Sequence, residues 1–318
     1  MTQDSSGCRD HTTVTAGPVP EGGQGTGDLG GGQPPVYSLK RGRTRSGFFA
    51  TIRRRAKIVD IALILAVPVV LVGLFAVSPS TKMALALAYQ DPTLLTIFAS
   101  HFVHMDLPHL LANLGAYIEV VPLVYVLSLL SGHRRRFLAA FGAFLLAFPF
   151  VLSGLNLLIP RPSIGYGFSG IATAFVGLLA VTLGEYASEH FGEALEGTLS
   201  PGLFAFAAGI IAIRVAPSVE TNLVILGLGI IGALLVLGPV RESSIDSLLG
   251  TIRRVPTKQR HFDLAALGVL IVLLFPFVAV PGAPVLEGTV PNVYTHTLGF
   301  CLGYLVPYST HRVLGISF

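Results

Sequence analysis

Long hydrophobic runs alternate with short polar segments along most of this 318-residue chain. About 20 apolar residues in a helix are enough to cross the hydrocarbon core of a bilayer. Eight runs come near or reach this length, and each predicts a membrane-spanning helix: 58–78, 107–130, 137–159, 168–186, 202–216, 221–240, 263–281 and 292–309. The fifth run is the shortest and is rich in Gly and Ala. The pattern predicts an all-α, polytopic membrane helix bundle.

The composition supports this interpretation and separates the tails from the bundle. Only 12% of the residues are charged and the mean hydropathy is +0.71, whereas soluble domains carry roughly 25% charged residues. Residues 1–45 are rich in Gly, Ser, Thr and Pro, and we expect them to be disordered because they have little apolar surface to bury. Residues 311–318 form a short cytoplasmic tail in this scheme.

Residues 46–57 are basic, with aromatic and aliphatic residues between the cations. Such a segment fits either a nucleic acid or the anionic cytoplasmic leaflet of a membrane. We favour the leaflet, because the segment lies directly before the first hydrophobic run and juxtamembrane cations are attracted to anionic lipids. The expected partner is therefore the lipid bilayer, and we expect no nucleic-acid partner.

The cations outside this segment predict how the helices are oriented. They gather before the first run, between the second and third, between the sixth and seventh, and after the eighth, at 53–55, 134–136, 241–260 and 312. Because Lys and Arg accumulate in cytoplasmic loops, we expect a multi-pass protein with a cytoplasmic N-terminus, placed in the cell membrane.

Polar residues lie at the start of three of the predicted helices. His109 and Asn113 begin the second, Ser169 begins the fourth and His296 begins the eighth. In the predicted topology these three helices run from the outside to the inside, so the polar residues lie at one depth near the outer face. Polar groups within a membrane are costly and indicate function.

Ser169 and His296 are a candidate nucleophile and base. Serine is a weak nucleophile that needs an adjacent base. His296, Gly299 and Gly303 share one helical face, and small residues follow Ser169 on its own helix. Small residues let membrane helices approach closely, which would bring the hydroxyl to the imidazole. The alternative is that the glycines serve packing alone and Ser169 bonds back to its own helix.

His109 and Asn113 are four residues apart, so they project from one helical face. Both side chains donate hydrogen bonds, and donors aimed at a developing oxyanion make a large contribution in acyl transfer. The rival interpretation is a metal site formed by His101, His104 and His109. Metal sites usually recruit carboxylates or further histidines, so we favour no metal and expect His104 to bond loop backbone near the outer interface.

Together these motifs resemble those of rhomboid intramembrane serine proteases over residues 58–310. The family has a His-x-x-x-Asn pair at the start of one helix, Gly-x-Ser-Gly at the start of another, and His followed by Gly-x-x-x-Gly in the last. The matching residues here are His109 and Asn113; Gly167, Ser169 and Gly170; and His296, Gly299 and Gly303. His104 also matches a histidine that the family often carries five residues before the first pair.

The resemblance implies a six-helix core and a serine endopeptidase without a cofactor or metal. Ser169 would attack the scissile carbonyl and His296 would take its proton, with no acidic third member. The Ser169 backbone N–H, His109 and Asn113 would hold the oxyanion, while His104 and the matching glycines would support the site. The partners implied are transmembrane protein substrates, cut near their outer end.

The chain also departs from the family pattern. Two extra helices, at about 202–240, lie between the Ser and His helices. Thr173 stands where the family often has an aromatic residue stacked on the histidine. Glu119 is nearer to Asn113 than the family's usual helix-end glutamate, and is either interior or paired with Arg214. The loop at 282–291 is either a cap over the site or a plain connector.

Two other functions compete with the protease. One is a non-catalytic rhomboid-like factor that binds membrane proteins, and the other is a transporter with polar residues near the bilayer midplane. Inactive relatives typically lose the Ser or the His, and this chain keeps both Ser169 and His296. The polar residues also gather toward one face rather than at the midplane. We therefore favour the active protease.

Overall fold

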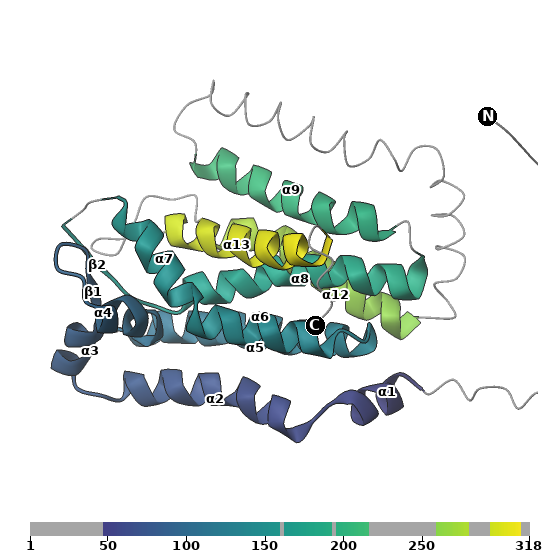
Figure 1. Cartoon of the computed structure of the whole chain (residues 1–318), viewed down its shortest axis with the longest axis horizontal. Helices are drawn as coiled ribbons and strands as arrows, with labels where there is room; N and C mark the ends of the chain where they lie inside the picture. Colours follow the sequence, from purple (N-terminus) through teal and green to yellow (C-terminus); the bar gives the residue numbers. More distant parts are fainter. Residues whose placement is uncertain (1–46, 160–161, 193–194, 216–258, 280–292, 313–318) are drawn as a thin grey trace, which may run out of the picture. The chain divides into compact units, whose positions relative to one another are not determined.

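The computed structural model describes residues 47–159, 162–192, 195–215, 259–279 and 293–312. These residues are almost entirely helical (Figure 1), which confirms the all-α prediction. In chain order the elements are α1 Phe48–Arg55, α2 Ile58–Phe75, α3 Pro79–Leu85, β1 Leu87–Ala88, α4 Leu94–Ala99, the 3-10 turn η1 Ser100–Phe102, α5 Leu107–Leu130, α6 Arg134–Leu146, α7 Phe148–Leu157, β2 Ile164–Gly165, α8 Ser169–Phe191, α9 Glu196–Val215, α12 Gln259–Ala279 and α13 Val293–Arg312. The two short strands pair antiparallel.

Five of the described helices are long and apolar enough to cross a membrane, so the chain has the make-up of a membrane protein. They are α2, α5, α8, α9 and α12, and the bent pair α6–α7 makes a sixth if it counts as one span. The helix α13, predicted as a span, is not among them. The predicted span 221–240, the tail 1–45 and the loop 282–291 lie outside the described residues, and the count of eight spans stays a prediction.

The predicted third span is not one straight helix. The chain bends by 45° between α6 and α7, at Ala147, and Pro149 lies in the first turn of α7. Proline is tolerated in the first turn of a helix but breaks a helix interior, because it lacks an N–H and its ring meets the preceding turn. The proline therefore explains why α6 does not continue as one helix.

The helix α8 is the central helix of the bundle. Its apolar window is 94% buried, against 22% for α2, and α13, α5, α9 and α12 all pack against it. A helix that is apolar on every side needs protein or lipid on every side. Aromatic side chains surround it from several elements, with Tyr117, Phe141 and Phe144 each in ring contact with Phe175 of α8.

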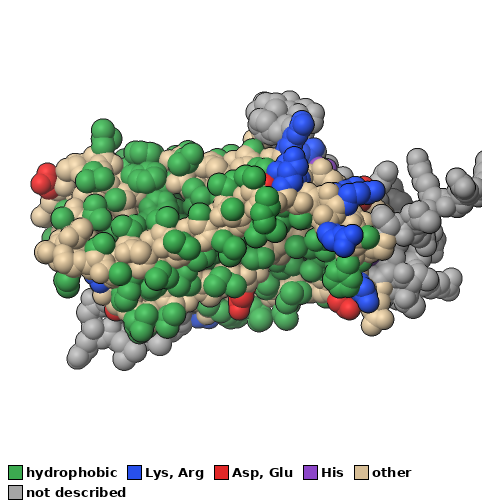
Figure 2. All heavy atoms as spheres, turned by 90° about the horizontal axis from the view of Figure 1, so that it is seen from below, with side chains coloured by type: hydrophobic (Ala, Val, Ile, Leu, Met, Phe, Trp, Pro, Cys, Tyr) green, Lys and Arg blue, Asp and Glu red, His purple; other side chains and the backbone are tan. Residues whose placement is uncertain are grey.

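The outer face of the bundle is apolar, and its cations gather toward one end. Figure 2 shows hydrophobic side chains spread over the face that it views, with Lys and Arg side chains concentrated at one end. The amphipathic helix α1 belongs to the basic segment: Phe48 and Ile52 pack on the core, whereas Arg53 and Arg54 are exposed. This arrangement is the one expected of a helix lying on a charged interface.

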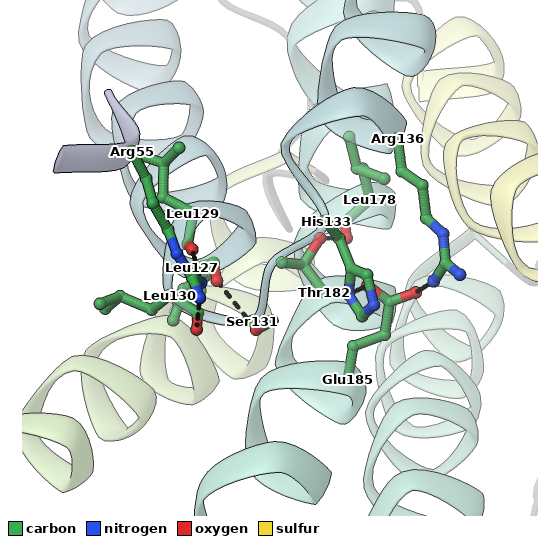
Figure 3. A network of polar contacts seen from close by, with 10 residues as sticks. All are labelled: Arg55, Leu127, Leu129, Leu130, Ser131, His133, Arg136, Leu178, Thr182 and Glu185. Carbon is green, nitrogen blue, oxygen red and sulfur yellow. Dashed lines mark hydrogen bonds and ion pairs between the residues drawn. The ribbon is translucent and has the colours of Figure 1, made fainter. Parts of the chain in front are cut away.

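Some cations of the 134–136 cluster are held inside the bundle by acidic partners. Arg134 donates to Asp60 of α2, with Nε 2.6 Å from Oδ2. Arg136 pairs with Glu185 of α8 at 3.0 Å, and His133 Nδ1 lies 2.9 Å from the same carboxylate (Figure 3). These contacts fix the start of α6 to α2 and to the far end of the central helix α8.

The same figure shows how the end of α5 is capped. Arg55 donates from Nη1 to the carbonyl oxygens of Leu129 and Leu130, at 2.6 and 3.2 Å. The last carbonyls of a helix have no partner within the helix. A cation here also complements the negative end of the helix dipole, so Arg55 ties the basic segment to the bundle.

Candidate active site

The helices α8 and α13 pack with their backbones in contact, as Figure 1 also shows by their adjacent positions. A methyl group added at Gly299 would lie 2.1 Å from the carbonyl oxygen of Gly170, and one at Gly303 would lie 2.1 Å from that of Ala174. Neither position has room for any side chain. The glycine face of α13 therefore sets how closely the two helices approach.

This contact places Ser169 and His296 at neighbouring points of the helix pair. Ser169 directly precedes Gly170 and begins α8, while His296 lies one turn before Gly299. The Thr295 methyl group also packs on Gly170, 2.6 Å from where a Cβ would be. Both Ser169 and His296 are half-buried, so this end of the helix pair is partly open.

Within the described part of the chain, the Ser169 hydroxyl has no hydrogen-bond partner. It does not bond back to its own helix, which was the alternative to a functional role. It also makes no hydrogen bond to His296 here. Nucleophile and base are often farther apart or poorly aligned without substrate, and they come together in the complex.

The ring of His296 is oriented by the end of α12. Its Nδ1 lies 3.0 Å from the carbonyl oxygen of Ala279, the last residue of that helix. A carbonyl only accepts, so Nδ1 carries the proton and donates it. In the neutral ring Nε2 is then an unprotonated acceptor. This is the form of histidine that can take a proton from a serine.

A polar pair not anticipated from the sequence anchors the turn that carries His296. The Thr295 hydroxyl donates to Asn156 Oδ1 at 3.0 Å, and Asn156 Nδ2 donates to the Leu152 carbonyl at 2.8 Å. Both Thr295 and Asn156 are buried. An asparagine inside an apolar run was the available signal, because polar groups at such depth are costly unless they have a task.

His109 lies directly over Gly167. A methyl group at Gly167 would be 2.6 Å from His109 Cε1, and the glycine has φ +109°, a conformation that residues with a side chain avoid. The backbone N–H of His109 is capped by the Asp106 carboxylate at 2.8 Å. The Thr295 methyl group of α13 packs on Gly170, three residues farther along from Gly167. The starts of α5, α8 and α13 thus lie together.

Asn113 is buried and uses part of its hydrogen-bonding capacity on its own helix. Its Nδ2 donates to the His109 carbonyl at 2.9 Å. A side-chain amide has two N–H groups, so one donor remains for a ligand. Asn113 therefore lies one turn below His109 on the face that the sequence predicted, with half of its donor capacity committed.

His104 braces the loop that precedes Ser169. It is fully buried, and its Nε2 accepts from the Phe168 N–H at 3.4 Å. Its ring packs edge-on against His109, with centroids 5.0 Å apart. Burial is the main cause that lowers the pKa of His104 to about 4, so the ring stays neutral and able to accept.

His101 is bound to a serine of α7. Its Nε2 lies 3.0 Å from the hydroxyl of Ser153, which itself donates to the Ile97 carbonyl at 2.8 Å. Burial lowers the pKa of His101 to about 4. Over the described ranges, no group of three His, Cys, Asp or Glu side chains is arranged to hold a metal ion.

The structure explains why Thr173 stands where the rhomboid pattern often has an aromatic residue. Thr173 fills the narrow space beside Gly299, where its hydroxyl would be 2.4 Å from an added Cβ, and it donates to the Gly170 carbonyl at 2.9 Å. A larger residue would push α13 away from α8. The Ala279 carbonyl, rather than an aromatic ring, orients the imidazole of His296.

Neither interpretation offered for Glu119 is correct. Its side chain is exposed on the outer face of α5, so it is not interior. Nor is Glu119 paired with Arg214, whose guanidinium lies 5.6 Å from the ring centroid of Phe277. The error arose because helical periodicity alone does not say which side of a helix its neighbours cover.

No family model, curated protein or solved structure matches this chain. The resemblance to rhomboid proteases therefore rests on the motifs of the sequence alone.

Proposed function

We propose that this protein is an intramembrane serine endopeptidase that cuts transmembrane segments of other membrane proteins. The observation that supports the proposal is the backbone contact of Gly170 with Gly299, because Ser169 and His296 each lie within one helical turn of it. The hydrogen bond from His296 Nδ1 to the Ala279 carbonyl also supports the proposal. It leaves Nε2 unprotonated, and a general base requires this tautomer.

In the proposed reaction the Ser169 hydroxyl attacks the carbonyl carbon of the scissile peptide. Its proton passes to His296 Nε2, which then gives a proton to the leaving amine as the C–N bond breaks. Water, deprotonated by the same nitrogen, releases the acyl group from Ser169. No acidic third residue takes part; the Ala279 carbonyl would orient the ring and stabilise its positive charge.

The negative oxygen of the tetrahedral intermediate needs hydrogen-bond donors. The proposed donors are the Ser169 backbone N–H, the His109 ring and the second N–H of Asn113. The Ser169 N–H is suitable because it is in the first turn of α8, where backbone N–H groups have no partner within the helix. The positive end of the helix dipole also lies there.

We further infer that the site lies near the outer surface, with the N-terminus in the cytoplasm. The distribution of cations among the loops supports this orientation. A substrate helix would have to unwind locally at the site, because a peptide bond within an intact helix is shielded by its own hydrogen bonds.

An activity-based probe tests the nucleophile directly. We expect a fluorophosphonate to label the purified protein in detergent, with the label on Ser169 by mass spectrometry of the peptides. Ser169→Ala should abolish labelling and His296→Ala should reduce it strongly. Ser163→Ala, at an exposed loop position, is the matched control and should label normally. Undiminished labelling of Ser169→Ala would refute the assignment.

A further inference from the structure

We propose that Tyr166 is a positioning residue whose ring holds the His109 imidazole in the orientation from which it donates to the oxyanion. This inference rests on the proposed function, since it concerns the reaction that Ser169 would carry out. The motifs of the sequence assign no task to Tyr166, although it lies only three residues before Ser169.

The His109 ring is held differently from the other histidine rings around the site. His101, His104 and His296 each have a ring nitrogen within hydrogen-bonding distance of a partner, at 3.0, 3.4 and 3.0 Å. Among the residues that the structure describes, neither ring nitrogen of His109 makes a hydrogen bond, and only its backbone groups are bonded. The orientation of the His109 ring must therefore come from the groups packed against it.

Three groups pack against the His109 ring. The backbone of Gly167 lies along one edge, since a methyl group there would be 2.6 Å from Cε1 and 2.7 Å from Nε2 of His109. His104 lies edge-on to the ring, with 5.0 Å between centroids and 75° between planes. The Tyr166 ring is tilted against it, with 5.7 Å between centroids and 54° between planes. His104 and Gly167 are buried, whereas Tyr166 is half-buried, so its ring can be replaced without emptying a closed cavity.

The backbone on both sides of Tyr166 is anchored. Gly165 belongs to the β1–β2 pair, and the Tyr89 hydroxyl packs on it so closely that an added methyl group would lie 2.6 Å away. On the other side, the Gly167 N–H donates to the Ser100 carbonyl at 2.9 Å. A side chain between two anchored residues has a defined position, so Tyr166 can fix the ring that it contacts.

The proposed task of His109 requires such a constraint. A functional side chain must be held within about 10–20° of its productive geometry, and His109 has no hydrogen bond on its ring to do this within the described chain. Tyr166 contributes its ring rather than a charge: burial raises the pKa of its phenol, so the side chain stays neutral. We therefore expect phenylalanine to serve in its place, whereas an aliphatic residue should not.

A double-mutant cycle in the full-length protein tests whether Tyr166 acts through His109. With a single-span substrate in liposomes, Tyr166→Leu should lower kcat about tenfold to 100-fold with little change in KM, because misplacing a donor by about 1 Å costs up to that much. Tyr166→Phe should keep most of the rate. In a His109→Ala background, Tyr166→Leu should change kcat by less than about twofold, because the ring that it positions is gone.

Tyr308→Leu is the matched control for this cycle. Tyr308 is also half-buried and in ring contact, with Tyr304 at 5.1 Å, but it lies twelve residues after His296 in α13, about 18 Å along the helix. It should keep kcat. Three results would overturn the proposal: an equal loss from Tyr166→Leu with and without His109, a loss in Tyr166→Phe as large as that in Tyr166→Leu, or a change confined to KM.

Nuclear magnetic resonance of the protein labelled with carbon-13 at histidine Cε1 gives a readout that does not need catalysis. The His109 signal is identified by its absence from His109→Ala. It should move in Tyr166→Leu, which removes the ring beside it, and stay near its wild-type position in Tyr166→Phe and Tyr308→Leu. Absence of cleavage by wild type would then count against the proposed function alone. A His109 signal that does not move in Tyr166→Leu would refute the positioning role.

Discussion

The α-carbon of Gly299 lies against the carbonyl oxygen of Gly170, with too little space between the two helices for a single methyl group. This contact fixes the level of His296 on α13 relative to Ser169 on α8. The proposed dyad thus depends on a packing feature three residues away from its base. Changes in these glycines should alter the chemistry without touching either reacting residue.

The first prediction concerns that contact. Gly299→Ala should lower the melting temperature in detergent and remove most cleavage activity, because overpacking costs about 1–3 kcal/mol and pushes α13 from α8. Gly142→Ala is the matched control, since a methyl group there meets nothing within 4 Å. It should retain activity and stability. Full activity in Gly299→Ala would show that the close approach is not required.

Loss of the buried pair beneath the base should impair the reaction more than binding. Thr295→Val leaves Asn156 Oδ1 without the hydroxyl donor, at a cost of about 1–3 kcal/mol. We expect kcat to fall and KM to change little, with fluorophosphonate labelling slowed in proportion. Thr295→Ser keeps the hydroxyl and should restore most of the rate. A loss in Thr295→Ser with the rate retained in Thr295→Val would instead indicate that only the methyl group matters.

Asn113→Ala tests the proposed oxyanion donor. One such donor contributes on the order of 3 kcal/mol to the transition state, so kcat should fall about 100-fold to 1,000-fold with little change in KM. The loss should be smaller than that of Ser169→Ala. A purely structural role predicts the opposite pattern, namely reduced thermal stability with kcat retained by the folded fraction.

Acid should destabilise the fold through its two buried neutral histidines. The pKa values of His101 and His104 are lowered to about 4 in the folded protein, against about 6.5 in the unfolded chain. The unfolded state therefore binds protons first as the pH falls. Stability should be greatest above pH 6.5 and decline between pH 6.5 and 4, by at most about 3 kcal/mol for each histidine.

Melting temperatures measured in detergent across that pH range would check this expectation. His101→Asn should show a smaller decline than wild type, whatever its stability at neutral pH. A stability that rises as the pH falls from 6.5 would contradict the neutral, buried state of these rings.

The sequence predicted straight helices well where their ends carry a local signal. The start and end of α5 were predicted to the residue: Asp106 caps its N-terminus, Pro108 lies in the first turn, and the apolar run stops at Leu130. The α6–α7 bend has its local signal in Pro149, which lies in the first turn of α7. The β1–β2 pair was missed because two-residue strands have no periodicity to detect.

The sequence predicted those features of the candidate site that lie within a single helix. The spacing of His296, Gly299 and Gly303 identified one face of α13, and that face packs on α8. The contacts made by Thr295 with Asn156, and by His296 with Ala279, join segments 139 and 17 residues apart. No local pattern encodes such partners, because they depend on how α7 and α12 are placed around the helix pair.

Cleavage of a model single-span protein in liposomes tests the central claim most directly. Wild type should produce two fragments, with the cut in the outer part of the membrane segment by mass spectrometry, and a metal chelator should leave the rate unchanged. Ser169→Ala and His296→Ala should each yield no fragments, while Ser163→Ala cuts normally. Normal cleavage by Ser169→Ala would contradict the account.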